Sequence, residues 1–192
     1  MQSLDDGGPC TVEDFATLRD QVIRSWSSAL DHDWSVPAGT LEWSCWATAD
    51  HTIDCVFSYA LFLASRAQVR YPQFGELHAL PDARPADLVE GLLAVTNMLI
   101  AVIEATPPGT HAIIRQRPPT TAPRRDFAAR GAHEMILHAH DIASGLGVAL
   151  RPDGDVCRRL RDHTATWGYG PDVTPTADAW SDLLQRSGRA RA

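Results

Sequence analysis

The chain has 192 residues, of which 44% are hydrophobic, and a formal net charge of −7. This length favours one domain, and this apolar content is sufficient for a folded core. The acidic balance argues against a nucleic-acid-binding protein, which usually presents a basic face. All 17 Lys and Arg residues are arginine, so Schiff-base, pyridoxal-phosphate and P-loop chemistry, which need a lysine, are excluded.

The N-terminal sequence MQSLDDGGPC lacks the cationic start and apolar stretch of a signal peptide. The longest apolar run, residues 92–103, is shorter than the roughly 20 residues that a membrane span requires. We therefore expect a cytoplasmic protein that does not enter a membrane. The four cysteines have no CxxC spacing, and in a reducing compartment they should be free thiols.

Helical periodicity begins near the start of the chain. Thr11 is a suitable cap for a helix over residues 11–30, whose apolar side chains recur at spacings of three and four. A loop containing proline and glycine follows, with Trp34, Trp43 and Trp46 around it. We expect these tryptophans to form a lid over the core beneath the loop.

The remaining helices are predicted from periodicity, caps and prolines. They cover residues 48–71, 84–105, 124–144, 153–167 and 177–184. Residues 110–123 contain three prolines and predict a long crossover, with a short extended stretch at 111–115. The tail SGRARA should fray. The chain is thus predicted to be all-α, a four-helix bundle with long crossover connections plus short C-terminal helices. We expect one domain over residues 1–192, with its core at about 11–170.

The fourth long helix carries the best candidate for chemistry. Glu134 and His138 are four residues apart and therefore project from one helix face. A carboxylate oxygen and an imidazole nitrogen are suitable ligands for zinc and similar divalent ions. The HExxH motif does not fit, because His133 and His138 are five apart and diverge by about 140° around the helix. We expect His133 and His140 to be surface or helix-packing histidines.

A third ligand must come from another helix, and His51 is the best candidate. The alternative for His51 is a partly exposed histidine near a helix end. Cys55, one turn later, is in reach of the same ion, although its apolar neighbours favour a core position. Asp54 and Asp141 each follow a candidate histidine by three residues, so each is a candidate to accept a hydrogen bond from an imidazole N–H. Solvated helix positions are the alternative.

Arg130 lies one turn before Glu134, near the proposed ligand face. We expect it to face the mouth of the pocket and to pair with Glu134 or with a substrate carboxylate. Arg130 is therefore a candidate substrate-binding residue. Asp141, on the same helix, is the second candidate.

Two segments resemble a known family. LEWSCWATADHTIDCVFSYA is similar to the tryptophan-rich loop and second helix of the DinB/YfiT-like superfamily, and in particular of the metal-binding N-terminal domain of mycothiol-dependent maleylpyruvate isomerase. RGAHEMILHAHDIASGLGV is similar to the E-xxx-H-x-W-D-x-A signature of that family. The resemblance covers residues 11–170 and implies His51, Glu134 and His138 as metal ligands. His140 stands where the family often has tryptophan.

The resemblance implies a divalent metal, foremost Zn2+ with Ni2+ or Fe2+ as alternatives, and mycothiol or a related thiol as cosubstrate. Three protein ligands leave one coordination position open, which is typical of catalytic sites. We expect a metal-dependent thiol S-transferase or thiol-exchange enzyme that acts on a small electrophile. The alternatives are a mycothiol-dependent maleylpyruvate-type cis–trans isomerase, a metal-dependent hydrolase, and a helical bundle that binds a small ligand without catalysis.

The C-terminal 40 residues are too few for a second domain with its own core. We expect Leu160, Trp167 and Trp180 to pack the short C-terminal helices against the bundle. The pocket should then be more open than in a two-domain isomerase, or be closed by a second subunit in a homodimer. An open pocket suits a bulky electrophile better than a small diacid, which is why we rank transfer above isomerisation.

Overall fold

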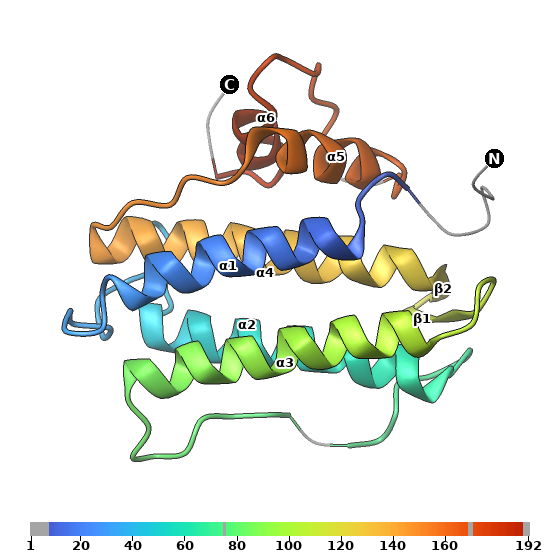
Figure 1. Ribbon diagram of the computed structural model, residues 1–192, viewed down its shortest axis with the longest axis horizontal. Helices are drawn as coiled ribbons and strands as arrows, with labels where there is room; N and C mark the ends of the chain where they lie inside the picture. Colours follow the sequence, from blue (N-terminus) through green and yellow to red (C-terminus); the bar gives the residue numbers. More distant parts are fainter. Residues whose placement is uncertain (1–7, 75, 169–170, 190–192) are drawn as a thin grey trace.

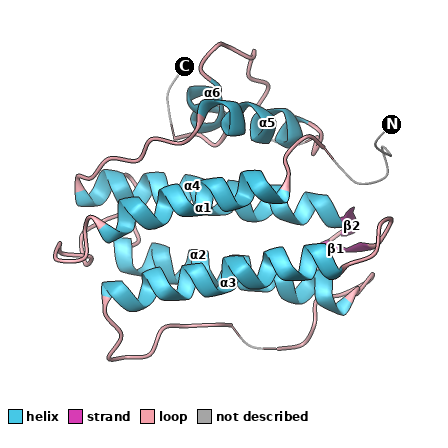
Figure 2. Cartoon of the chain, viewed as in Figure 1, coloured by secondary structure: helices cyan, strands magenta, loops and turns pink. Residues whose placement is uncertain are grey.

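The computed structural model describes residues 8–74, 76–168 and 171–189, and this part of the chain is mostly helical, as predicted (Figure 2). Its elements are α1 (Val12–Ser27), α2 (Cys45–Ser65), α3 (Pro85–Ala105), β1 (His111–Gln116), β2 (Pro119–Pro123), α4 (Arg124–Leu146), α5 (Gly154–Ala165) and α6 (Ala179–Arg186). The two strands form one antiparallel pair.

The four long helices pack side by side, with α1 beside α4 and α2 beside α3 (Figure 1). α2 also packs along α4, which brings the two helices with the candidate ligands together. Their apolar faces form one continuous core. The largest fully buried side chains include Trp26, Phe15, Phe127, Leu63, Leu99 and Met135.

The two middle helices differ in how well their ends were predicted. α3 has the predicted bounds, because Pro85 occupies its first turn and Thr106 leaves the helical conformation before two prolines. α2 ends at Ser65, six residues earlier than predicted. The helix ends because the next residue, Arg66, adopts the left-handed conformation with φ of 51°. Glycine or asparagine usually occupies such a position, so the sequence did not indicate this end.

The segment before α4 is a β-hairpin rather than a plain crossover. The predicted extended stretch is confirmed as β1, but it pairs with β2, which lies in the part that was predicted as crossover. Pro119 and Pro123 lie at the two ends of β2, where a missing backbone N–H is tolerated. The hairpin leads directly into α4.

Only some of the tryptophans in the loop before α2 cover the core. Trp34 is 4% exposed and contacts Trp26 edge to face, so it is the expected lid. Trp43 is instead 49% exposed. The loop lies so close to α4 that a Cβ on Gly145 would be 2.3 Å from the carbonyl oxygen of Pro37. This contact fixes the loop, and thereby the start of α2, against α4.

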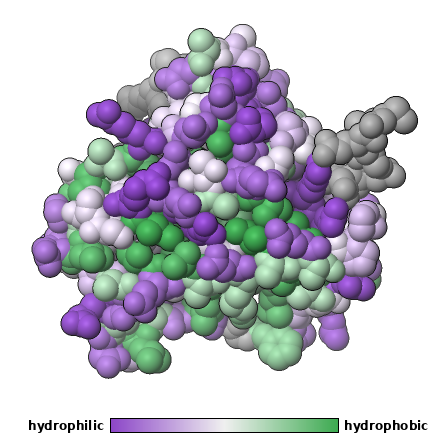
Figure 3. All heavy atoms as spheres, in the orientation of Figure 1, coloured by the Kyte–Doolittle hydropathy of each residue, from purple (hydrophilic) through white to green (hydrophobic). Residues whose placement is uncertain are grey.

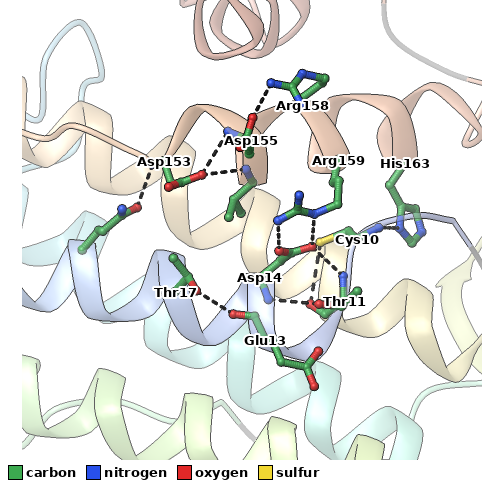
Figure 4. Close-up of polar contacts among 12 residues, drawn as sticks. Cys10, Thr11, Glu13, Asp14, Thr17, Asp153, Asp155, Arg158, Arg159 and His163 are labelled. Atoms are coloured by element: carbon green, nitrogen blue, oxygen red, sulfur yellow. Dashed lines mark hydrogen bonds and ion pairs between the residues drawn. The ribbon is translucent and has the colours of Figure 1, made fainter.

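The C-terminal helices pack against the layer of α1 and α4, as expected (Figure 1). Leu160 and Leu183 are fully buried in the common core, and Trp167 and Trp180 pack on it. Figure 4 shows how the start of α1 is tied to α5: Arg159 forms an ion pair with Asp14. The backbone N–H of Cys10 donates to Nδ1 of His163 over 3.3 Å.

The face in Figure 3 mixes hydrophobic and hydrophilic residues. Large exposed apolar side chains lie on α3 and in the segment before it, for example Leu93, Met98, Phe74 and Leu80. By length and composition α3 could span a membrane. In this fold, however, one side of α3 is buried in the core through residues such as Leu92 and Leu99.

Candidate metal centre

His51, Glu134 and His138 converge at the interface of α2 and α4. Each offers one ligand atom, and these three atoms lie within 4.8 Å of one another. Oε1 of Glu134 is 3.6 Å from Nε2 of His51 and 3.2 Å from Nε2 of His138. The two imidazole rings meet edge to face, with 5.5 Å between their centroids. The predicted ligand set is therefore brought together by the fold.

The donor set fits a divalent cation. Ligands about 2.0–2.1 Å from a tetrahedral zinc ion are roughly 3.3 Å apart, close to the donor separations found here. All three side chains are partly buried, with exposed fractions of 36%, 25% and 16% for His51, Glu134 and His138. Two neutral nitrogens and one carboxylate suit zinc, nickel or iron. The side facing solvent leaves room for a further ligand.

Asp141 fixes the orientation of His138. The Nδ1 of His138 lies 3.2 Å from Oδ2 of Asp141, so this ring nitrogen donates and Nε2 is directed to Glu134 and the metal position. Asp141 is buried and is held in turn by Arg189, whose Nε and Nη2 donate to its carboxylate. A carboxylate that orients a ligating imidazole is typical of metal sites. Asp141 thus lies behind the ligand, as expected from its spacing, and is not exposed for direct contact with substrate.

The charges in the site depend on each other. Burial alone would lower the pKa of His138, but its hydrogen bonds to Asp141 and Glu134 outweigh this effect and raise the pKa to about 9. Burial opposes ionisation of Glu134, yet its hydrogen bonds to His138 and His51 hold its pKa well below the usual range. Without metal, Glu134 is therefore a carboxylate that binds a proton on His138. A cation would replace that proton.

Asp54 of α2 and Trp43 of the preceding loop are placed differently from expectation. Asp54 accepts a hydrogen bond from the backbone N–H of Leu77 over 2.9 Å, so it anchors the segment before α3 instead of orienting His51. The ring of His51 is contacted by Trp43, with 5.0 Å between centroids. The exposed tryptophan of the loop is thus a neighbour of the metal centre, which composition and spacing did not reveal.

Cys55 lies at the edge of the site. Its Sγ is 3.4 Å from Nε2 of His51, but the cluster of mutually close ligand atoms does not include it. Burial, and next the charge of Glu134, raise the pKa of the Cys55 thiol far above its usual value. The sequence left two alternatives for Cys55, a metal ligand or a core residue. In this geometry it is a protonated thiol next to the candidate ligands.

Arg130 does not reach Glu134, contrary to our expectation. Its Nε donates to Asp126, one turn earlier on α4, over 2.6 Å, and its guanidinium lies 4.2 Å above the ring of Trp167. Asp126 also accepts hydrogen bonds from His163 and Trp167. These contacts direct Arg130 toward Asp126 and Trp167 and away from Glu134.

The other two histidines of α4 are packing residues, in agreement with the sequence. His133 and His140 each contact a tryptophan of the C-terminal segment edge to face, at 5.4 and 5.7 Å between centroids. Removal from water, and then the nearby arginines, lower the pKa of His133 to about 4. His133 is therefore neutral at pH 7.

A cavity of about 300 Å³ opens beside the ligands. Glu134 and His138 form one side of it, and the C-terminal segment forms the other through Trp167, Arg186 and Arg189. The tail that was expected to fray therefore contributes Arg189 to the site; residues 190–192 lie outside the described part of the chain. A second cavity, of about 410 Å³, reaches His51 from the side of Trp43.

Comparisons of the chain with protein-family models, curated proteins and solved structures find no match.

Proposed function

We propose that this protein is a metal-dependent thiol S-transferase or thiol-exchange enzyme with a DinB/YfiT-like four-helix bundle. Its ion would be held by His51, Glu134 and His138, and its cosubstrate would be mycothiol or a similar low-molecular-weight thiol. The observation that carries the proposal is the convergence of these three ligand atoms within 4.8 Å, next to a cavity.

A divalent ion held by three protein ligands supplies a Lewis acid that lowers the pKa of an incoming thiol. The chain's own residues supply the rest. Asp141 holds His138 with Nε2 facing the ion, and Arg189 holds Asp141. His133 stays neutral and brings no further charge into the cavity.

Substrate conversion would take place in the cavities beside the ligands. The thiol sulfur bonds to the electrophilic carbon, the leaving group departs with its bonding electron pair, and the thiol proton passes to solvent. Two cavities, of about 300 and 410 Å³, adjoin the candidate ligands. Their presence supports the binding of a thiol and an electrophile at the same time. That space is why we rank transfer above isomerisation of a small diacid.

The first test is metal content. Purified protein should contain close to one zinc, nickel or iron per chain, and added zinc should raise the melting temperature of stripped protein. His138→Ala should abolish both effects and remain folded. His140→Ala is the matched control on the same helix, since His140 contacts Trp180 and not the ligands. Wild-type protein that takes up no metal would favour a ligand-binding bundle instead.

The second test is turnover. Metal-loaded protein should conjugate mycothiol to monobromobimane faster than the stripped protein or His138→Ala does. Efficient isomerisation of maleylpyruvate without conjugation would favour the isomerase. Ester or amide hydrolysis that needs no thiol would favour the hydrolase.

A further inference from the structure

A helix cap gives the last described residues a fixed conformation. α6 has only eight residues, and a helix this short is not stable alone in water. Just after it, Gly188 adopts the left-handed conformation with φ of 78°, and its backbone N–H donates to the carbonyl oxygen of Gln185 over 3.0 Å. The backbone N–H of Arg189 donates to the carbonyl oxygen of Leu184 over 2.9 Å. These two bonds form a Schellman motif, which turns the chain at Gly188.

The turn brings the end of α6 to α4. α6 itself packs mainly against α5, where Leu183 is fully buried (Figure 1). Towards α4, Trp180 contacts His140 edge to face, and Arg189 forms an ion pair with Asp141, the next residue of that helix. Arg189 thus ties the end of the C-terminal helix to the residue that orients the candidate ligand His138.

The carboxylate of Asp141 is shared between Arg189 and the metal centre. Nε and Nη2 of Arg189 are 2.9 and 2.7 Å from its two oxygens, whereas Nδ1 of His138 is 3.2 Å from one of them. Within residues 8–74, 76–168 and 171–189, these are the hydrogen-bond donors to this carboxylate, which belongs to a residue only 4% exposed. The two-pronged contact with Arg189 is therefore what holds the carboxylate in the plane that His138 needs.

Orientation and charge act in opposite senses on a bound cation. The guanidinium of Arg189 repels a cation, but its pairing with Asp141 offsets most of that charge. Without Arg189 the carboxylate would be free to turn away, and His138 would lose the acceptor that fixes its ring. Since partners behind a metal ligand typically contribute 10- to 100-fold to metal affinity, we expect orientation to outweigh repulsion.

We propose that Arg189 is a positioning residue of the metal centre, and that metal binding and the docking of α6 therefore stabilise each other. The inference depends on the proposed function for the presence of the ion and specifies how the same site is regulated. By linkage, the factor by which docked Arg189 raises metal affinity is also the factor by which bound metal favours docking. Metal would thus keep the C-terminal segment closed over the cavity that Glu134 and His138 line.

The first measurement is zinc affinity, by competition with a chromophoric chelator. Arg189→Gln should lower it roughly tenfold, and Arg189→Lys, which keeps the charge, should retain more of it. Gly188→Ala should also lower it, because alanine disfavours the φ of 78° that directs Arg189, although no atom lies within 4 Å of the new methyl group. Gly109→Ala is the matched control, with φ of 76° and equal space, but before β1.

The second measurement is hydrogen exchange of the backbone amides in residues 179–189. Zinc should slow this exchange roughly tenfold in the wild type and less than about threefold in Arg189→Gln, with the amides of α3 as the internal reference. The absorption spectrum of protein loaded with Co2+ reports the geometry of the ligands. It should change in Arg189→Gln and Gly188→Ala and not in Gly109→Ala, whereas a role confined to packing α6 would leave it unchanged.

Two kinds of failure are distinguishable. If the wild type binds zinc, and Arg189→Gln and Gly188→Ala bind it equally well, the inference is wrong and the proposed function stands. A rise in affinity in Arg189→Gln also overturns the inference, because repulsion would then outweigh orientation. So does exchange of residues 179–189 that zinc does not slow. If the wild type binds no zinc, the proposed function fails and the inference fails with it.

Discussion

Nε and Nη2 of Arg189 lie 2.9 and 2.7 Å from the two carboxylate oxygens of Asp141, and Asp141 in turn accepts a hydrogen bond from the candidate metal ligand His138. We predict that Asp141→Asn lowers zinc affinity by about 10- to 100-fold, because a neutral amide has one acceptor oxygen in place of the two that His138 and Arg189 share. Competition with a chromophoric chelator measures the change. Asp54→Asn, equally spaced from His51 but bonded to the Leu77 backbone, should leave the affinity unchanged.

The stability of the metal-free protein should depend on pH through His138. Its pKa is raised to about 9 in the fold, above the value of about 6.5 for an unfolded chain. The resulting stabilisation is fully present below pH 6.5 and is lost as the pH rises through about 9. Urea unfolding in chelator should show a loss on the order of 2 kcal/mol between pH 6.5 and 9.5. This loss should disappear in His138→Gln and persist in His140→Gln.

Cys55 should not be needed for metal binding. We expect Cys55→Ala to retain zinc affinity within about threefold. His51→Ala should lower zinc affinity by at least 10- to 100-fold, which is the loss typical of a residue that only orients a ligand. The reason is geometric, since the mutually close ligand atoms come from three residues that do not include Cys55. In the Co2+ protein, before any thiol is added, a thiolate absorption band that vanishes in Cys55→Ala would contradict this prediction.

The buried network around Asp126 should be a major source of stability. Asp126 is 5% exposed; it joins α4 to α5 through His163 and pairs with Arg130 on its own helix. Asp126→Ala should cost about 3 kcal/mol or more, because it removes a buried carboxylate that pairs with Arg130 and accepts hydrogen bonds from His163 and Trp167. Asp20→Ala, which removes the half-exposed partner of Arg19, should cost less than about 1 kcal/mol. Denaturant unfolding of both variants checks the contrast.

Gly145 should tolerate no side chain. A Cβ there would lie 2.3 Å from the carbonyl oxygen of Pro37 and 2.7 Å from Sγ of Cys45. Gly145→Ala should therefore cost roughly 2 kcal/mol or more and displace the loop that leads into α2. Gly154→Ala has no atom within 4 Å of the new methyl group and should be neutral or slightly stabilising. Thermal melts, with zinc affinity as a second readout, distinguish the two.

The sequence predicted the features that depend on local spacing. A four-residue separation on a helix places Glu134 and His138 on one face in any packing arrangement. Pro85 and the prolines after Ala105 mark the ends of α3 for the same local reason. The pairing of His51 with these ligands is not local, and it was inferred from residue type and from the family resemblance.

The features that sequence reasoning missed depend on neighbours distant in the chain. Asp54 and Asp141 have the same spacing from a histidine, but Leu77 binds one and Arg189 supports the other. Arg130 was assigned to the pocket because Asp126 was not recognised as a buried acceptor. The pairing of Arg130 with Asp126 is local, since the two residues are four apart on α4. The contacts of Leu77 and Arg189, by contrast, form only when distant parts of the chain pack together.

The candidate metal ligands lie on two helices, and His51 and Glu134 are 83 residues apart in the chain. An ion bound to all three side chains would hold these two helices together in the folded state, and the unfolded chain would release it. The stabilisation would therefore follow mass action, at about 4 kcal/mol when free metal is 1,000 times the dissociation constant. Loaded and stripped molecules would then have different lifetimes against proteolysis. The supply of metal would set how long each folded chain persists, independently of any reaction at the site.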